Sequence, residues 1–179
     1  QIDEFIQAPE INEKTIKLIE RKFNIEKLRA KAGLPIYLQR KQILDHIKDN
    51  KFTIIVGDTG CGKSTQLPQY LLEEYEDTKD KILWILPRRL PAITLCERVG
   101  QELQDSSKVG YDVKSKHRIL PTTRLTFTTD VTFINEIIET KKNSKEDKLP
   151  YSIVVLDEVH ERNLNGYSYF LPQGKSHER

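Results

Sequence analysis

Hydrophobic side chains along this chain gather in short runs that alternate with longer amphipathic stretches. Three runs of strand length are mostly apolar or β-branched, at 52–56, 82–86 and 151–156. Continuous runs of this kind are typical of strands whose two faces are both covered in a parallel sheet. Two shorter stretches, at 109–113 and 124–128, are predicted to be further strands.

Apolar residues at helical spacing fill the stretches between these runs. They predict helices over 37–48, from the end of a glycine-rich turn to about 76, over 91–103 with Pro91 in the first position, and from Asp130 onward. The polar residues 141–148 are expected to form a loop. Because the predicted strands alternate with helices, the pattern favours an α/β fold with a mainly parallel sheet.

The first 33 residues are more highly charged than the rest of the chain. They predict a helical extension that is interrupted near Asn24. Its apolar stripe consists of Ile11, Ile16, Leu18, Ile19, Phe23 and Leu28. Its basic residues are Arg21, Lys22, Lys27, Arg29 and Lys31. We interpret these basic residues as a solvated face, with nucleic-acid binding as the alternative.

The run at 52–56 leads directly into a sequence that fits the phosphate-binding loop G-x-x-x-x-G-K-[ST]. The matching residues are Gly57, Asp58, Thr59, Gly60, Cys61, Gly62, Lys63 and Ser64, and Thr65 follows them. Glycines allow the backbone to turn its N–H groups toward an anion, and the next helix adds its positive end. Lys63 is expected to reach the β- and γ-phosphates, and the Ser64 hydroxyl to bind Mg²⁺.

A glycine-rich turn that matches this pattern by chance is the alternative. The predicted strand before the loop and the predicted helix after it favour binding of a nucleoside triphosphate.

An acidic pair, Asp157 and Glu158, follows the apolar run at 151–156. In open α/β sheets ligands bind at the carboxyl ends of strands, so the pair is expected at the same edge as the phosphate-binding loop. Asp157 would then hold Mg²⁺, and Glu158 would orient and deprotonate an attacking water. The alternative is an ordinary helix cap at the end of the strand. His160 alone carries little information.

Composition narrows the class of protein. Hydrophobic residues make up 37% of the 179 positions and charged residues 31%, which is typical of a polar globular chain. The net charge of only +2 implies that any contact with nucleic acid is local. No apolar run approaches the roughly 18 residues of a membrane span, and two cysteines form no disulfide framework, so we expect an intracellular protein of the nucleus or cytoplasm.

Several motifs in the same order resemble those of the DEAH/DExH helicases of superfamily 2. The segment from Asp157 to Arg162 resembles motif II, with Val159 in place of alanine, and the segment from Gly57 to Gln66, followed by Leu67-Pro68-Gln69-Tyr70, resembles motif I. Leu34-Pro35-Ile36-Tyr37, with Arg40 and Ile43-Leu44, resembles the segment that precedes motif I. Pro87-Arg88-Arg89 resembles motif Ia, and Thr128-Thr129-Asp130 resembles motif Ib.

The resemblance implies an RNA substrate, or DNA, and it implies roles for particular residues. By position, Arg88 and Thr129 would contact the backbone of a single strand, with Arg89 and Asp130 contacting it or supporting the loop. Arg98 would stack on adenine. His160 would couple the nucleotide site to a second RecA-like domain. An exposed basic turn at 88–89 and a surface charge at 98 are the alternatives.

The resemblance divides the chain into a helical extension (1–33), a partial RecA-like ATP-binding domain (34–166) and a tail of unclear structure (167–179). Nothing in the tail resembles motif III, the family's next strand. The chain also has no methionine and begins with Gln1. We therefore expect a piece of a longer protein that lacks the second RecA-like domain and its arginine finger.

These observations predict the first motor domain of an ATP-dependent RNA helicase that uses ATP and Mg²⁺. Alone, it should hydrolyse ATP slowly or not at all. One alternative is a non-enzymatic module that binds nucleotide or RNA. Another is a phosphate-loop ATPase that does not act on nucleic acid.

Overall fold

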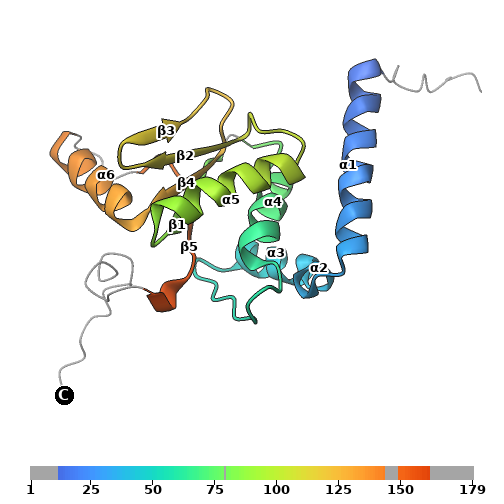
Figure 1. Cartoon of the computed structure of the whole chain (residues 1–179), viewed down its shortest axis with the longest axis horizontal. Coiled ribbons are helices and arrows are strands. Elements are labelled where there is room, and N and C mark those ends of the chain that lie inside the picture. Colours follow the sequence, from blue (N-terminus) through green and yellow to red (C-terminus); the bar gives the residue numbers. More distant parts are fainter. Residues whose placement is uncertain (1–11, 79, 144–148, 162–179) are drawn as a thin grey trace, which may run out of the picture.

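The computed structural model describes residues 12–78, 80–143 and 149–161, and Figure 1 shows their arrangement. These residues form a sheet in the order β3-β2-β4-β1-β5. The strands are β1 (Ile82–Leu86), β2 (Val109–Val113), β3 (Lys116–Arg118), β4 (Leu125–Thr129) and β5 (Ile153–Leu156). All neighbouring strands are parallel except β2 and β3, which form an antiparallel pair. The predicted α/β class and mainly parallel sheet are therefore confirmed.

Seven helical segments accompany the sheet within the described residues. They are α1 (Glu13–Ala32), α2 (Pro35–Leu38), α3 (Arg40–Asp49), α4 (Lys63–Glu74), α5 (Arg89–Glu102), α6 (Asp130–Asn143) and the 3₁₀ turn η1 (Val159–Glu161). The helix predicted over 37–48 is thus two helices, α5 begins two residues before Pro91, and α6 includes residues 141–143 of the predicted loop. Among the described helices, none is long and apolar enough to cross a membrane.

Strand β1 lies between β4 and β5, and its side chains contribute to both hydrophobic cores. Ile82, Trp84 and Leu86 face a core shared with α3, α4 and α5, while Leu83 and Ile85 pack on the other face with Phe133 of α6. All five strand residues are buried. The continuous apolar run therefore has the cause that the sequence predicted, a strand covered on both faces.

The strand predicted over 52–56 does not form in this structure. These residues adopt no regular secondary structure, and Phe52, Ile54 and Val56 are 63%, 88% and 91% exposed. A strand needs a neighbour for its backbone N–H and C=O groups. Within the described residues the sheet ends at β5, and no strand pairs with residues 52–56.

Helix α1 is continuous through Asn24, so the predicted interruption is wrong. The predicted apolar stripe is also wrong, because its described residues are 36% or more exposed: Ile16, Leu18, Ile19, Phe23 and Leu28. The buried residues of α1 are instead Ile25 and Arg29. Ile11 and the tail at 167–179 lie outside the described residues.

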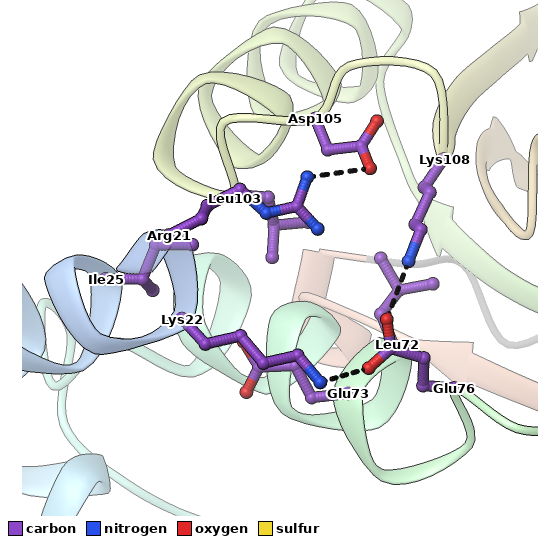
Figure 2. Close-up of a pocket in the computed structure, with 9 residues that line it drawn as sticks. All are labelled: Arg21, Lys22, Ile25, Leu72, Glu73, Glu76, Leu103, Asp105 and Lys108. Atoms are coloured by element: carbon purple, nitrogen blue, oxygen red, sulfur yellow. Dashed lines mark hydrogen bonds and ion pairs between the residues drawn. The ribbon is translucent and has the colours of Figure 1, made fainter. Parts of the chain in front are cut away.

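Ion pairs explain why α1 turns this face toward the domain (Figure 2). Arg21 pairs with Asp105 at 3.1 Å, and Lys22 and Lys108 both pair with Glu76 of the turn after α4. The interpretation of the basic residues as a solvated face therefore holds for Lys27 and Lys31, which are exposed, but not for Arg21.

Arg29 is the most deeply buried of these basic residues, at 6% exposure. Its guanidinium group donates to both carboxylate oxygens of Glu73, at 2.9 and 2.8 Å, and to Gln69 at 2.8 Å. It also lies over the ring of Tyr70, and Arg40 lies over the same ring. Because Glu73, Gln69 and Tyr70 belong to α4, Arg29 links α1 directly to the helix that follows the phosphate-binding loop.

Candidate nucleotide site

The phosphate-binding loop has the backbone that its glycines predict. Gly60 and Gly62 have φ values of 84° and 99°, in the left-handed region that favours glycine. Gly62 is also the N-cap of α4, and a Cβ atom there would lie 2.9 Å from Ile36 and 3.1 Å from Leu34. Position 62 therefore requires glycine for two reasons: its positive φ, and the lack of room for a Cβ atom beside Ile36 and Leu34.

Lys63 begins α4 and turns its side chain back over the loop. Its ammonium group donates to the carbonyl oxygens of Gly57 and Asp58, the latter at 3.0 Å, and lies 3.6 Å from the Cys61 sulfur. Ser64 and Thr65 follow in the first turn of α4, and both are partly exposed. The loop thus places an ammonium group and a hydroxyl group at the positive end of one helix.

Arg98 is linked to α4 through one carboxylate. Arg98 donates to Glu102 at 2.9 Å, and the other oxygen of Glu102 accepts from Gln66 and Gln69 at 2.8 and 2.6 Å. The Arg98 side chain is 61% exposed. The predicted adenine-contacting arginine therefore lies on a part of α5 that is joined to the first two turns of the phosphate-loop helix.

Asp157 directly follows β5 and is buried, with 9% of its surface exposed. Its Oδ1 accepts from the Glu158 backbone N–H at 3.0 Å, and its Oδ2 accepts from the Trp84 indole N–H at 3.0 Å. Its own backbone N–H donates to Ile85 at 2.9 Å, which continues the pairing with β1.

Glu158 and His160 are brought together at the surface. Glu158 has φ 52°, an unusual value for a residue with a side chain, and its carboxylate lies 3.3 Å from His160 Nε2. Their side chains are 45% and 76% exposed. Backbone strain of this kind is common at functional sites. The catalytic role of Glu158 stays a prediction.

The face of the sheet to which Asp157 belongs follows from β5. Ile153 and Val155 pack on the core that contains α4 and α5, whereas Leu156 packs on the α6 side. Side chains alternate along a strand, so Asp157 continues the series on the α4 side, where it meets Trp84. Asp157 and the phosphate-loop helix thus share one face of the sheet. The closeness of the Asp157 carboxylate to the Lys63 amine stays a prediction.

The parallel strands also bring the other predicted residues to one edge. Leu86 of β1 is level with Thr129 of β4, and Ile85 is level with Leu156 of β5. The residues that follow these strands, Arg88 and Arg89, Asp130, and Asp157 and Glu158, therefore emerge at the same carboxyl edge.

Exposure differs among the four predicted strand-contacting residues. Arg88 and Arg89 are exposed, and Arg89 donates to the Lys114 carbonyl at 3.3 Å. Thr129 is only 4% exposed, and its hydroxyl lies 2.9 Å from that of Thr132 in the first turn of α6. Asp130 accepts from the Val131 N–H at 2.8 Å. In this structure Thr129 thus serves the start of α6, while the arginines face solvent.

The oxygen donors available suit Mg²⁺. Ser64 offers a hydroxyl and Asp157 a carboxylate, and Mg²⁺ typically takes one or two such protein ligands together with phosphates and water. The described residues contain no group of three or more histidine, cysteine or acidic side chains that could hold a metal by themselves. A magnesium ion here would therefore take most of its ligands from the triphosphate and water.

Sequence reasoning missed two residues of this region, Trp84 and Glu102. Trp84 was visible only as part of an apolar strand, since nothing in the sequence pairs it with a residue 73 positions away. Glu102 could have been noticed, because it lies four residues after Arg98 on one helix face.

Comparisons of this chain with known families, proteins and structures all identify helicases. The family model described as "DEAD/DEAH box helicase" matches residues 37–172. Similar proteins include the probable ATP-dependent RNA helicase DHR2 of Saccharomyces cerevisiae, 38% identical over 141 residues, which cover 76% of this chain and 18% of that protein. The putative ATP-dependent RNA helicase rha-2 of Caenorhabditis elegans is 35% identical over 155 residues, 86% of this chain and 13% of that protein.

Among solved structures, the DEAH/RHA helicase HrpB of Escherichia coli is similar, with a TM-score of 0.64 and 30% sequence identity. The likeness covers 74% of this chain and 16% of HrpB. The chain thus spans less than a fifth of the length of each of these three proteins.

Proposed function

Since the chain belongs to the DEAD/DEAH box helicase family, in the region of the first RecA-like domain, we propose that it is the ATP-binding motor domain of an ATP-dependent RNA helicase. The observation that carries the proposal is the shared position of the two halves of the site. The phosphate-binding loop leads into α4, and the acidic pair follows β5, where Asp157 is on the α4 side of the sheet.

The chain's own residues have distinct tasks in this proposal. The loop N–H groups and the Lys63 ammonium bind the phosphates, and Lys63 exchanges its present carbonyl partners for phosphate oxygens. Ser64 and Asp157 would hold Mg²⁺, which neutralises charge that develops on the phosphates. Glu158 orients the attacking water and accepts its proton.

Glu158 is exposed enough to meet water, and its contact with His160 keeps the carboxylate near the turn. An adenine ring would stack on the guanidinium plane of Arg98, whose side chain is 61% exposed. Coupling through His160 to a second RecA-like domain, and that domain's arginine finger, belong to the longer protein. Such a finger contributes roughly 10³ to 10⁵ in rate. The residues present here would therefore bind nucleotide but turn it over slowly by themselves.

The substrate proposed is single-stranded RNA, with DNA as the alternative. Support comes from Arg88 and Arg89, which are exposed at the carboxyl edge of the sheet, next to the proposed ATP site. Guanidinium groups are suited to phosphate oxygens, and contacts to the backbone position a strand without reading its sequence. We also propose that the protein acts inside the cell, in the nucleus or cytoplasm, where RNA and ATP are available.

The substitution Glu158→Gln in the full-length protein tests the proposed enzyme. It removes the proton acceptor while leaving shape and size, so we expect ATP hydrolysis to fall by about 10² or more while ATP binding is retained. Glu20→Gln, an exposed change of the same chemistry on α1, is the control. If Glu158→Gln and the unmodified protein hydrolyse ATP at the same rate, Glu158 is not the proton acceptor, and if neither hydrolyses ATP, the domain is a binding module instead.

Stimulation by RNA tests the substrate. We expect single-stranded RNA to raise the rate of ATP hydrolysis, and Arg88→Ala to weaken that stimulation by removing a backbone contact. Lys41→Ala, which removes an exposed positive charge on α3, should leave it unchanged. Equal rates with and without RNA, and with and without DNA, would favour an ATPase that does not act on nucleic acid.

A further inference from the structure

Trp84 reaches the carboxylate that the proposed function assigns to the metal. Its indole N–H donates to Asp157 Oδ2 at 3.0 Å, and the tryptophan is only 1% exposed. Indole nitrogen is a donor only, so the direction of this hydrogen bond is fixed. A tryptophan on β1 thus contacts the acidic residue that directly follows the neighbouring strand β5.

The rest of the sheet holds Trp84 firmly. Trp84 is level with Val155 of β5 and Phe127 of β4, and the Phe127 ring lies 6.2 Å from the indole, centroid to centroid. Because Val155 precedes Asp157 by two residues on the same face, the indole lies beside the point where the carboxylate emerges. The donor is therefore placed by three paired strands rather than by a loop.

The Asp157 carboxylate is consequently held through both of its oxygens. The Glu158 backbone N–H donates to Oδ1 at 3.0 Å, and the indole donates to Oδ2. Two donors on different oxygens fix the rotation of the carboxyl group. Hydrogen bonds of this kind to ligands of a metal commonly orient the ligand, and their loss costs about 10-fold to 100-fold in metal affinity or activity.

We propose that Trp84 is a positioning residue that orients the Asp157 carboxylate toward the divalent cation. This inference rests on the proposed function, because it requires Asp157 to be a ligand. A simpler alternative is that a buried indole N–H has only found an acceptor, as buried tryptophans usually do. The two possibilities differ in whether metal binding depends on the indole.

The test measures binding of Mn²⁺, as a substitute for Mg²⁺, to the full-length protein in the presence of a non-hydrolysable ATP analogue. Bound Mn²⁺ is measured as the loss of the electron paramagnetic resonance signal of free Mn²⁺. We expect Trp84→Phe, which keeps an aromatic ring but removes the N–H, to weaken Mn²⁺ binding about 10-fold. The concentration of Mg²⁺ that gives half-maximal ATP hydrolysis should rise by a similar factor.

Two further variants make the result unambiguous. Leu83→Val alters buried packing on the opposite face of β1, away from the indole and Asp157, so it should lower stability but leave Mn²⁺ binding unchanged. Asp157→Asn should reduce Mn²⁺ binding strongly. If Asp157→Asn binds Mn²⁺ normally, the proposed function itself fails. If Asp157→Asn is impaired while Trp84→Phe binds like the unmodified protein, only the role of Trp84 is overturned.

Should Trp84→Phe fail to fold, the unmodified protein carries the same test. The resonance of the Trp84 indole N–H, identified by nuclear magnetic resonance, should shift when Mg²⁺ is added together with the ATP analogue. Addition of the analogue alone should cause a smaller change. An indole resonance that is identical with and without Mg²⁺ would refute the proposal.

Discussion

At the scale of single residues, Gly62 shows how closely the phosphate-binding loop is specified. Its φ of 99° is unfavourable for any residue with a Cβ atom, and its neighbours Leu34 and Ile36 leave no room for one. Gly60 has a similar φ of 84°, yet nothing lies within 4 Å of a Cβ atom placed there. The two glycines therefore separate the cost of backbone strain from the cost of crowding.

This comparison gives a prediction for stability. Gly60→Ala should lower the free energy of unfolding by about 1 kcal/mol, because only the left-handed backbone is penalised. Gly62→Ala should cost about 1–3 kcal/mol more, because the added methyl also crowds Ile36. Urea unfolding of both variants measures the difference. Equal losses at the two positions would show that crowding at position 62 has no effect.

At the scale of elements, α1 is attached to the domain by charges more than by its apolar stripe. Arg29 is buried between Glu73, Gln69 and the ring of Tyr70, all on α4. The sequence predicted a helical extension here, but neither its continuity through Asn24 nor its orientation, because helical spacing identifies an apolar stripe without showing which residues it contacts. The ion partners lie far along the chain, so no local pattern could identify them.

Removing this anchor should loosen α1. Arg29→Ala leaves Gln69 and one side of Glu73 without their donor, and we expect a loss of about 2–3 kcal/mol in the free energy of unfolding. Lys31→Ala, an exposed change near the end of the same helix, should stay within about 0.5 kcal/mol. Thermal unfolding of the two variants measures the loss of stability, and hydrogen exchange of the α1 amides measures the loosening of the helix. If the two variants behave alike, Arg29 does not anchor the helix.

The joint between α1 and the turn after α4 should also respond to acid. The hydrogen bond from Lys22 holds the pKa of Glu76 below its usual value, and a second bond from Lys108 acts in the same direction against burial. A lowered pKa in the folded state means that this carboxylate stabilises the fold above its unfolded pKa of about 4.5. The contribution is lost as pH falls through the lower folded value.

Glu76→Gln tests this pH dependence. The difference in unfolding free energy between the unmodified protein and Glu76→Gln should be present near neutral pH and should shrink as the solution is acidified below about pH 4.5. Unfolding by urea at a series of pH values measures it. A difference that stays constant, or grows, on acidification would mean that the Lys22 and Lys108 pairs do not stabilise the joint.

Most elements were visible in the sequence, and the exceptions have physical causes. The predicted runs at 82–86, 109–113, 124–128 and 151–156 form strands whose limits lie within two residues of the prediction. Strand β3 was missed because it has only three residues, all polar, and pairs through a tight turn in which Ser115 has φ 72°. The segment 52–56 has the right composition for a strand but lacks a neighbour in the described sheet.

At the scale of the whole molecule, the sheet explains how distant motifs become one site. Parallel pairing of β4, β1 and β5 brings the residues after each strand to one edge. The sequence predicted this edge, because ligands of open α/β sheets bind at the carboxyl ends of strands. The sequence could not predict the partners of Asp157, because Trp84 is on the neighbouring strand and 73 positions away along the chain.

The central claim is that the phosphate-binding loop and the acidic pair serve one magnesium-bound triphosphate. A crystal or cryo-electron microscopy structure of the full-length protein with Mg²⁺ and a non-hydrolysable ATP analogue tests it most directly. We predict that Lys63 contacts the phosphates while the Asp157 carboxylate faces the same metal ion, directly or through its bound water. A triphosphate bound at the loop with Asp157 on the opposite rim of the sheet would contradict the claim.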